Sequence, residues 1–126
     1  MVAAKSVLIV DPSDETRDVL RCALEHRGHR TLGARRVEEG LALAESCRPD
    51  CIVLDLEIEP QGRGEDHVAA GFAARSASQP LVLLGTLRSS RQTPTRAEGA
   101  ATEFVAKPYH YAPLIRKIEA LLASQP

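Results

Sequence analysis

The sequence is short of aromatic residues and cysteine, and each shortage excludes a class of protein. It has no tryptophan, two phenylalanines and two tyrosines among 126 residues, which leaves few rings to stack a flavin. Its three cysteines are an odd number without CxxC spacing, which argues against a disulfide framework and for a reducing compartment. We therefore expect a cytoplasmic protein.

The chain also lacks a strong net charge and a long apolar run. Sixteen basic residues nearly cancel seventeen acidic ones, so the formal net charge is −1, and we expect no direct binding to nucleic acid or membrane. No apolar stretch approaches the roughly 20 residues of a membrane helix, and Asp11 interrupts the N-terminal one too early for a signal peptide. The length suits one domain, which we predict to span residues 1–126.

Short apolar runs are present instead, and they have the composition of buried strands. Three are near-continuous in Val, Ile and Leu and do not alternate with polar residues, as in a parallel sheet covered on both faces. A fourth run is shorter, and the stretch "RTLGA" is a weaker candidate. The predicted strands are Val7–Val10, Arg30–Ala34, Cys51–Leu54, Leu81–Leu84 and Phe104–Ala106.

Helical patterns follow each predicted strand. Ser13 is a suitable N-cap for a helix that ends at Gly28, with Val19, Cys22 and Ala23 facing inward. The stretches Val37–Cys47, "EDHVAAGFAARSAS" and "RQTPTRAEGAA" predict three more helices, and "YAPLIRKIEALLAS" predicts the last. Their inward residues are predicted to be Leu41, Ala44 and Cys47, then Val68, Phe72 and Ala73, and finally Leu114, Ile115, Ile118, Leu121 and Leu122.

This alternation of strand and helix, repeated five times, predicts an α/β fold with a doubly wound, five-stranded parallel sheet. Ligands of such sheets bind beyond the carboxyl ends of the strands. The first strand is followed by Asp11, the third by Asp55 and the fifth by Lys107. A single charge at a strand end means little, but three of them predict a site at one edge of the sheet.

Four segments make the chain similar to the receiver domains of response regulators in two-component signalling. They are "VLIVD" at the first strand, "PDCIVLDL" around the third, "PLVLL" at the fourth and "FVAKPY" at the fifth. The spacing agrees as well, because 44 residues separate Asp11 from Asp55 and 52 separate Asp55 from Lys107. The resemblance extends from Ser6 to about Leu122 and implies a flavodoxin-like (βα)5 receiver architecture.

The resemblance also implies a chemistry for the strand ends. Asp55 would accept a phosphoryl group from a histidine kinase or phosphotransfer protein. Mg²⁺ would be held by Asp11, Asp55 and the backbone carbonyl of Glu57. Lys107 would pair with the acceptor and then with the phosphoryl group, and the peptide bond from Lys107 to Pro108 is expected to be cis.

Signal transmission and partner binding are implied at further positions. In this family, a switch couples a Ser or Thr at the fourth strand end to an aromatic residue on the fifth strand. The adjoining surface binds effectors, output domains or a second copy of the domain. The switch positions here are Gly85, Thr86 and Phe104, and the partner surface would include Arg88, Arg91, Tyr109 and Tyr111.

The chain departs from the family pattern at three places. Pro12 stands where a second acid is usual, which would weaken Mg²⁺ without excluding it, because Mg²⁺ often manages with one or two carboxylates. Asp14 and Glu15 follow within a turn and either reach the metal or form a solvated first helical turn. Gly85 lacks the hydroxyl of the switch position, and the loop "EIEPQGRG" carries its proline and second glycine one residue late.

Three interpretations therefore stay open at the level of the sequence. The first is an atypical receiver that is phosphorylated on Asp55, with altered switching. The second is a pseudo-receiver that binds partners without phosphate. The third, an enzyme or cofactor binder on the same kind of sheet, lacks a glycine-rich phosphate loop after the first strand, and we predict that the protein is not an enzyme.

The cysteines and histidines offer one more hypothesis. Cys22, His26 and His29 have a spacing that could hold a metal, but a closed zinc site needs four ligands, and Cys22 fits the apolar stripe of its helix. We therefore expect no metal there. Cys47 and Cys51 are predicted to be small buried hydrophobic residues.

Overall fold

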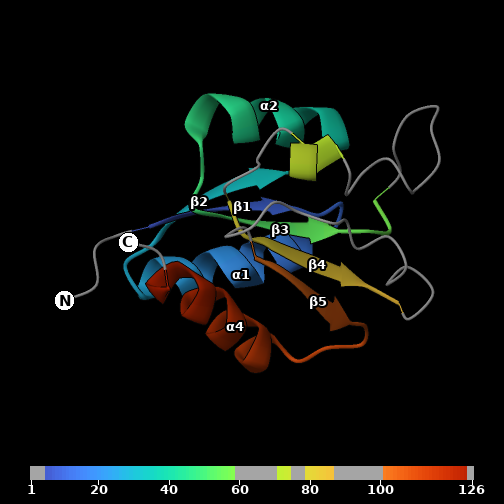
Figure 1. Ribbon diagram of the computed structural model, residues 1–126. Coiled ribbons are helices and arrows are strands. Elements are labelled where there is room, and N and C mark those ends of the chain that lie inside the picture. Colours follow the sequence, from blue (N-terminus) through green and yellow to red (C-terminus); the bar gives the residue numbers. More distant parts are fainter. Residues whose placement is uncertain (1–4, 59–70, 75–78, 87–100, 125–126) are drawn as a thin grey trace.

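The computed structural model describes residues 5–58, 71–74, 79–86 and 101–124, and it contains one parallel sheet of five strands (Figure 1). The strand order is β2-β1-β3-β4-β5, and every neighbouring pair is parallel. The strands are β1 (Ser6–Val10), β2 (Arg30–Ala34), β3 (Cys51–Asp55), β4 (Leu81–Gly85) and β5 (Thr102–Ala106). All five predicted strands are confirmed, and each boundary agrees within two residues.

Helices cover both faces of the sheet, as the doubly wound prediction requires. Figure 1 shows α2 (Val37–Cys47) and the helical residues 71–74 on one face, and α1 (Asp14–His26) and α4 (Tyr111–Ala123) on the other. The predicted Ser13 cap is confirmed, because its side chain accepts a hydrogen bond from the Thr16 N–H. Gly28, with φ of +90°, ends the turn after α1.

The core is split between the two faces because successive strand residues point to opposite sides. Val7 and Ile9 face α1 and α4, whereas Leu8 and Val10 face α2. All residues of β3 and β4 are buried, which explains why their sequences do not alternate. The predicted stripe of α4 is buried throughout, from Leu114 to Leu122.

Gly40 allows α2 to pack closely on the sheet. A Cβ at this position would lie 2.8 Å from a methyl group of Val10 and 3.0 Å from the ring of Phe72. Phe72 is itself fully buried, and Ala73 packs beside it, as predicted. The small residue on α2 thus makes room for a large one from the next helical segment.

Two cysteine predictions were wrong. Cys22 is exposed, because the inward residues of α1 are Leu20 and Leu24 and a residue two positions from each lies on the far side of the helix. Cys47 is also exposed, at the last position of α2, where the chain turns through Arg48 with φ of 45°. Only Cys51 is buried as predicted, and burial raises the pKa of its thiol to about 12.

Several predictions lie outside the described residues. These are the inward position of Val68, residues 91–100 of the helix predicted for 91–101, and the shifted glycines of the loop 57–64. Within the described part of the chain, no helix has the length and apolar character needed to cross a bilayer.

Candidate functional site

The site lies at the carboxyl end of the sheet, where three strands deliver charged residues to one place. Asp55 is the last residue of β3, while Asp11 and Lys107 directly follow β1 and β5. The ladder of backbone hydrogen bonds continues through both: the Asp11 N–H donates to the Ala34 carbonyl at 3.0 Å, and the Lys107 N–H donates to the Gly85 carbonyl at 2.8 Å. The parallel pairing therefore holds the backbone of the site rigidly.

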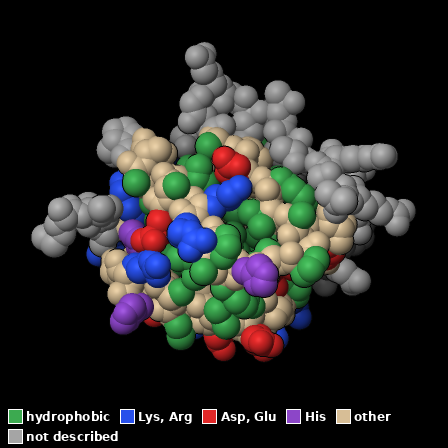
Figure 2. All heavy atoms as spheres, turned by 90° about the horizontal axis from the view of Figure 1, so that it is seen from below, with side chains coloured by type: hydrophobic (Ala, Val, Ile, Leu, Met, Phe, Trp, Pro, Cys, Tyr) green, Lys and Arg blue, Asp and Glu red, His purple; other side chains and the backbone are tan. Residues whose placement is uncertain are grey.

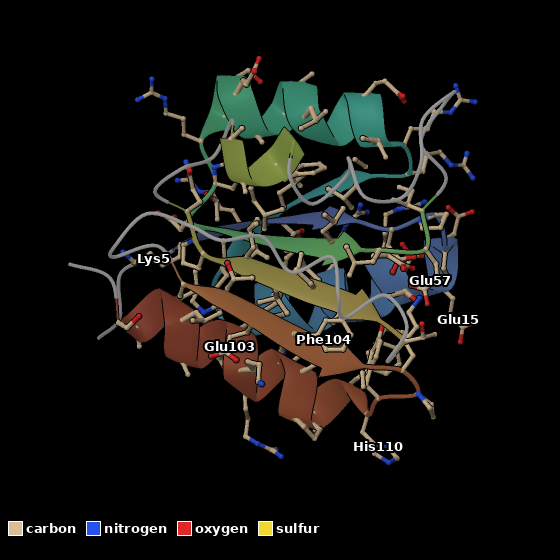
Figure 3. The ribbon with its side chains drawn as sticks, turned by 45° about the vertical axis from the view of Figure 1, so that its right-hand side comes forward. Lys5, Glu15, Glu57, Glu103, Phe104 and His110 are labelled. Carbon is tan, nitrogen blue, oxygen red and sulfur yellow. The ribbon has the colours of Figure 1, made fainter. Side chains whose placement is uncertain are left out.

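Asp55 is the centre of this group, and it is 5% exposed. Its Oδ1 accepts hydrogen bonds from the Lys107 Nζ and from the Glu57 N–H, each at 2.8 Å. The Lys107 Nζ also lies 3.6 Å from the Glu57 carboxylate. Figure 3 shows Glu57 at the end of the sheet to which the strands point, with Glu15 nearby on α1. The predicted meeting of Lys107 with Asp55, across the end of β4, is confirmed.

Asp11 is held beside Asp55 by its own turn. Its Oδ1 accepts the Ser13 N–H at 2.8 Å, and its backbone carbonyl accepts a hydrogen bond from Arg17. Burial, followed by the charge of Asp55, raises the pKa of Asp11 to about 6, although the Ser13 N–H and Lys107 act in the opposite direction. Two buried carboxylates with one ammonium group leave this place short of positive charge.

Lys107 is the cation of the site. Burial alone would lower its pKa, but the hydrogen bond and charge of Asp55, with the charges of Glu57 and Asp11, raise the pKa above its ordinary value. The side chain therefore stays charged at neutral pH. Its bond to Pro108 is cis, as expected from the sequence.

The donor atoms fit Mg²⁺ in type, although they are few. Asp11 and Asp55 offer carboxylate oxygens, the ligands that this hard cation prefers, whereas Pro12 has none. Asp14 does not reach the site, because its carboxylate pairs with Arg17 and lies 3.5 Å from Arg35 on the surface. Glu15 is exposed. Among the described residues, no group of three or more acidic, His or Cys side chains is placed to hold a metal.

The switch positions lie at the end of β4, which stands between β3 and β5, and on β5 itself. Gly85 is buried at the end of β4 and has no side chain, whereas Thr86 is exposed. Phe104 is half-buried on β5 (Figure 3) and packs against the core on the α2 side. The position that would read the phosphoryl group therefore carries no hydroxyl, although the aromatic position is filled.

A cavity of about 550 Å³ opens beside Lys107. It is lined by Thr16, Thr86, Lys107, Pro108, Tyr109 and Tyr111. The two tyrosine rings meet edge to face, with centroids 5.7 Å apart and planes at 87°, and both pack against the core. Tyr109 and Tyr111 thus belong to the rim of the site, while Arg88 and Arg91 lie outside the described residues.

Sequence reasoning missed Thr16 and Arg17 as residues of the site. Thr16 lines the cavity, and Arg17 fixes the carbonyl of Asp11. Both lie in the first turn of α1, directly after the Ser13 cap. A capped helix that begins at a strand end places its first turn over that end, and this signal could have identified them.

A second charged cluster, which we call the α1–α4 cluster, lies at the opposite end of the sheet and consists of Arg27, His29 and Glu119. Glu119 accepts a hydrogen bond from the Arg27 Nε at 2.7 Å, and its other oxygen is 3.4 Å from the His29 Nε2. Figure 2 shows this face of α1 and α4, where basic, acidic and histidine side chains lie together. The cluster borders a cavity of about 670 Å³, also lined by Arg116.

Comparison with known proteins agrees with this geometry. A model of the response regulator receiver domain matches residues 7–119. The transcriptional regulatory protein AfsQ1 of Streptomyces coelicolor is 31% identical over 118 residues, which are 93% of this chain and 51% of that protein. Protein PilH of Pseudomonas aeruginosa is 26% identical over 117 residues, 93% of this chain and 97% of its own.

Solved structures agree on the fold. The chemotaxis response regulator CheY4 of Vibrio cholerae has a TM-score of 0.75 at 21% identity, covering 94% of this chain and 99% of that one. A receiver domain of Francisella response regulator 1452 has a TM-score of 0.76 at 18% identity, with coverage of 94% and 97%. The present chain spans about half the length of AfsQ1 and almost all of PilH.

Proposed function

Because the chain belongs to the response regulator receiver domain family, we propose that Asp55 accepts a phosphoryl group from a histidine kinase or phosphotransfer protein. The observation that carries the proposal is the 2.8 Å contact between the Lys107 Nζ and the Asp55 Oδ1, beside the buried carboxylate of Asp11. A buried carboxylate with a fixed ammonium partner suits attack on phosphorus, because Lys107 neutralises the developing charge.

The reaction is a transfer between two covalent bonds. A carboxylate oxygen of Asp55 forms a bond to phosphorus, the bond from phosphorus to the donor's imidazole nitrogen breaks, and the imidazole leaves with the electron pair and takes up a proton. Lys107 and the Glu57 N–H hold the Asp55 carboxylate in place during this step. Asp11, Asp55 and the Glu57 carbonyl are the groups that would hold Mg²⁺, which supplies positive charge to the phosphoryl oxygens when bound.

Pro12 replaces an acid of the family pattern and Gly85 replaces a Ser or Thr, and both replacements predict an altered activity. A charge about 4 Å from a divalent cation is worth roughly 8 kcal/mol before desolvation at an effective dielectric near 20, so even a residual loss of about 2–3 kcal/mol from Pro12 weakens Mg²⁺ some 30- to 150-fold. The missing hydroxyl at Gly85 removes a hydrogen bond to a charged group, worth about 1.5–3 kcal/mol. Phosphorylation is therefore expected to require more Mg²⁺ and to transmit its signal differently.

The rest of the proposal concerns partners. As a signalling module rather than an enzyme, the domain 1–126 would act in the cytoplasm on a protein effector or an output domain. The surface at Tyr109 and Tyr111 would also suit a homodimer. Relatives such as AfsQ1 are named as transcriptional regulators, and the present chain spans only half of that protein. We assign no nucleic-acid binding to this domain itself, because its net charge is −1.

The test is phosphorylation of the purified chain with acetyl phosphate or phosphoramidate and Mg²⁺. An acid-stable, base-labile adduct, located by mass spectrometry on the peptide that holds Asp55, is expected. Asp55→Ala should abolish it, whereas Asp14→Asn, which changes an exposed carboxylate of α1, should not. Equal labelling of Asp55→Ala and the unchanged chain would refute the proposal.

Pro12 and Gly85 favour a second candidate, a pseudo-receiver that binds its partner without phosphate. In that case Asp55→Asn, which keeps the shape of the side chain, leaves partner affinity unchanged. A large loss of binding for Asp55→Asn, in the absence of any donor, would count against this candidate.

A further inference from the structure

The cavity beside Lys107 has a wall of hydroxyl groups, next to the charged residues of the site. Thr16 comes from the first turn of α1, Thr86 from the end of β4, and Tyr109 from the segment that joins β5 to α4. Lys107 is shared between this cavity and the Asp55 carboxylate. Lys107 thus connects the Asp55 carboxylate to a cavity lined by hydroxyl groups, whereas Gly85 offers none.

Tyr109 lies close enough to the acidic residues of the site to be affected by their charge. Its pKa is raised to about 12, first by burial and then by the charges of Asp11, Tyr111 and Asp55, while the side chain of Thr16 faces its hydroxyl and acts in the opposite direction. The hydroxyl therefore stays protonated at physiological pH and is available as a donor. The Thr16 hydroxyl donates to the Tyr109 oxygen, because a hydrogen bond that lowers the pKa of a phenol is one that stabilises the phenolate.

Tyr109 is also joined to the last helix. Its ring meets that of Tyr111 edge to face at 5.7 Å, and Tyr111 is the first residue of α4. Both rings pack against the core face that holds the buried stripe of α4. A change in the position of Tyr109 would therefore reach the start of α4 directly, without passing through the fourth strand end.

Resting on the phosphorylation of Asp55 proposed above, we propose that Tyr109 reports the phosphoryl group in place of the hydroxyl that Gly85 lacks. The Tyr109 hydroxyl donates a hydrogen bond to a phosphoryl oxygen and moves the start of α4 through its contact with Tyr111. The acceptor of this hydrogen bond is charged, which makes the bond stronger than one between two neutral groups.

The composition of the chain supplies the experiment. Tyr109 and Tyr111 are the two tyrosines of the sequence, and there is no tryptophan. Tyr111→Phe keeps a ring against Tyr109 and leaves Tyr109 as the lone tyrosine, so the intrinsic emission of this variant reports the hydrogen bonding of Tyr109. Addition of acetyl phosphate and Mg²⁺ should change this emission in step with adduct formation, and the further substitution Asp55→Asn should abolish the change.

Amide chemical shifts test the transmission. With adduct occupancy measured by mass spectrometry and matched between samples, phosphorylation should shift the amides of residues 111–114 in the unchanged chain. Tyr109→Phe should lose most of that shift and keep the shifts at residues 55–57. Thr86→Val, which alters another lining residue of the cavity, should retain the shift at residues 111–114.

The outcomes separate this inference from the proposed function. If no adduct forms on Asp55, both fail together. If the adduct forms but the Tyr109 emission stays constant, or if Tyr109→Phe shifts residues 111–114 as fully as the unchanged chain, only the inference is overturned. Loss of the shift in Thr86→Val with its retention in Tyr109→Phe would assign the reporting role to Thr86 instead.

Discussion

Charged residues gather at both ends of this sheet, and the two groups differ in how well their charges are balanced. At the carboxyl end, Asp11 and Asp55 are 2% and 5% exposed and share one ammonium group. At the amino end, the α1–α4 cluster pairs Glu119 with Arg27, and both side chains are at least one-third exposed. The first group is a buried excess of negative charge, whereas the second holds a partly exposed ion pair beside the buried His29.

This difference separates a site from a structural contact. A buried carboxylate without its own cation destabilises the fold unless a proton or a bound cation compensates it. An exposed ion pair contributes little to stability and needs no further explanation. The comparison thus predicts that charge removal stabilises the carboxyl end and slightly destabilises the amino end.

Asp11→Asn tests the larger effect. The pKa of Asp11 is about 6 in the folded protein against an ordinary value of 3.8. The folded state therefore holds this proton more tightly than the unfolded chain, and the resulting stability is present below pH 3.8 and lost as pH rises through 6. Removal of the charge should raise the free energy of unfolding by about 3 kcal/mol at pH 8 without Mg²⁺, measured by urea denaturation.

The same variant should show almost no gain near pH 3, which lies below both pKa values, so that Asp11 is mostly protonated in both states. Asp14→Asn serves as the matched control, because that carboxylate is exposed on the surface of α1, and it should change stability by less than about 0.5 kcal/mol at either pH. A pH-independent effect of Asp11→Asn would contradict the explanation from burial and the Asp55 charge.

Pro12→Asp adds a second acid at the carboxyl end of the sheet, and it should increase the difference in charge balance between the two ends. We expect Mg²⁺ to bind about 30- to 150-fold more tightly, which corresponds to about 2–3 kcal/mol, in a titration followed by amide shifts at Asp11, Asp55 and Lys107. Pro12→Asn relieves the proline without adding charge, and it should bind Mg²⁺ with close to the original affinity. Equal gains in the two variants would assign the effect to the backbone rather than to charge.

Ser13→Ala tests a smaller contribution at the same end. The hydroxyl of Ser13 caps α1 through the Thr16 N–H at 3.2 Å, and its loss should lower the free energy of unfolding by about 1 kcal/mol. Thermal and urea unfolding of Ser13→Ala and Ser13→Asp provide the measurement. Asp is also a good N-cap, so a loss of stability in both variants would argue against capping as the cause.

The α1–α4 cluster should give the smallest effect. A double-mutant cycle with Arg27→Ala and Glu119→Ala is expected to yield a coupling energy of about 0.2–1 kcal/mol, decreasing at high salt, as for other exposed ion pairs. A coupling above about 2 kcal/mol would show that Arg27 and Glu119 form a tighter pair than their exposure indicates.

Local sequence was sufficient for the elements whose signals are local. The near-continuous apolar runs of β3 and β4, the cap at Ser13 and the stripe of α4 were all predicted and are confirmed. The side-chain orientations of α1 were less predictable, because Cys22 and Leu24 are both apolar and the periodicity alone did not decide between them. Packing against the sheet selected the face with Leu20 and Leu24.

The sequence by itself determined the order of strands and helices and placed Asp11, Asp55 and Lys107 at strand ends, because hydrophobic periodicity and chain punctuation are properties of neighbouring residues. Only the tertiary structure decided that Asp14 lies beside Arg35, and that Thr16 and Tyr109 face each other beside Lys107. These contacts join residues far apart in the chain, and their distances follow from how the strands and helices pack together.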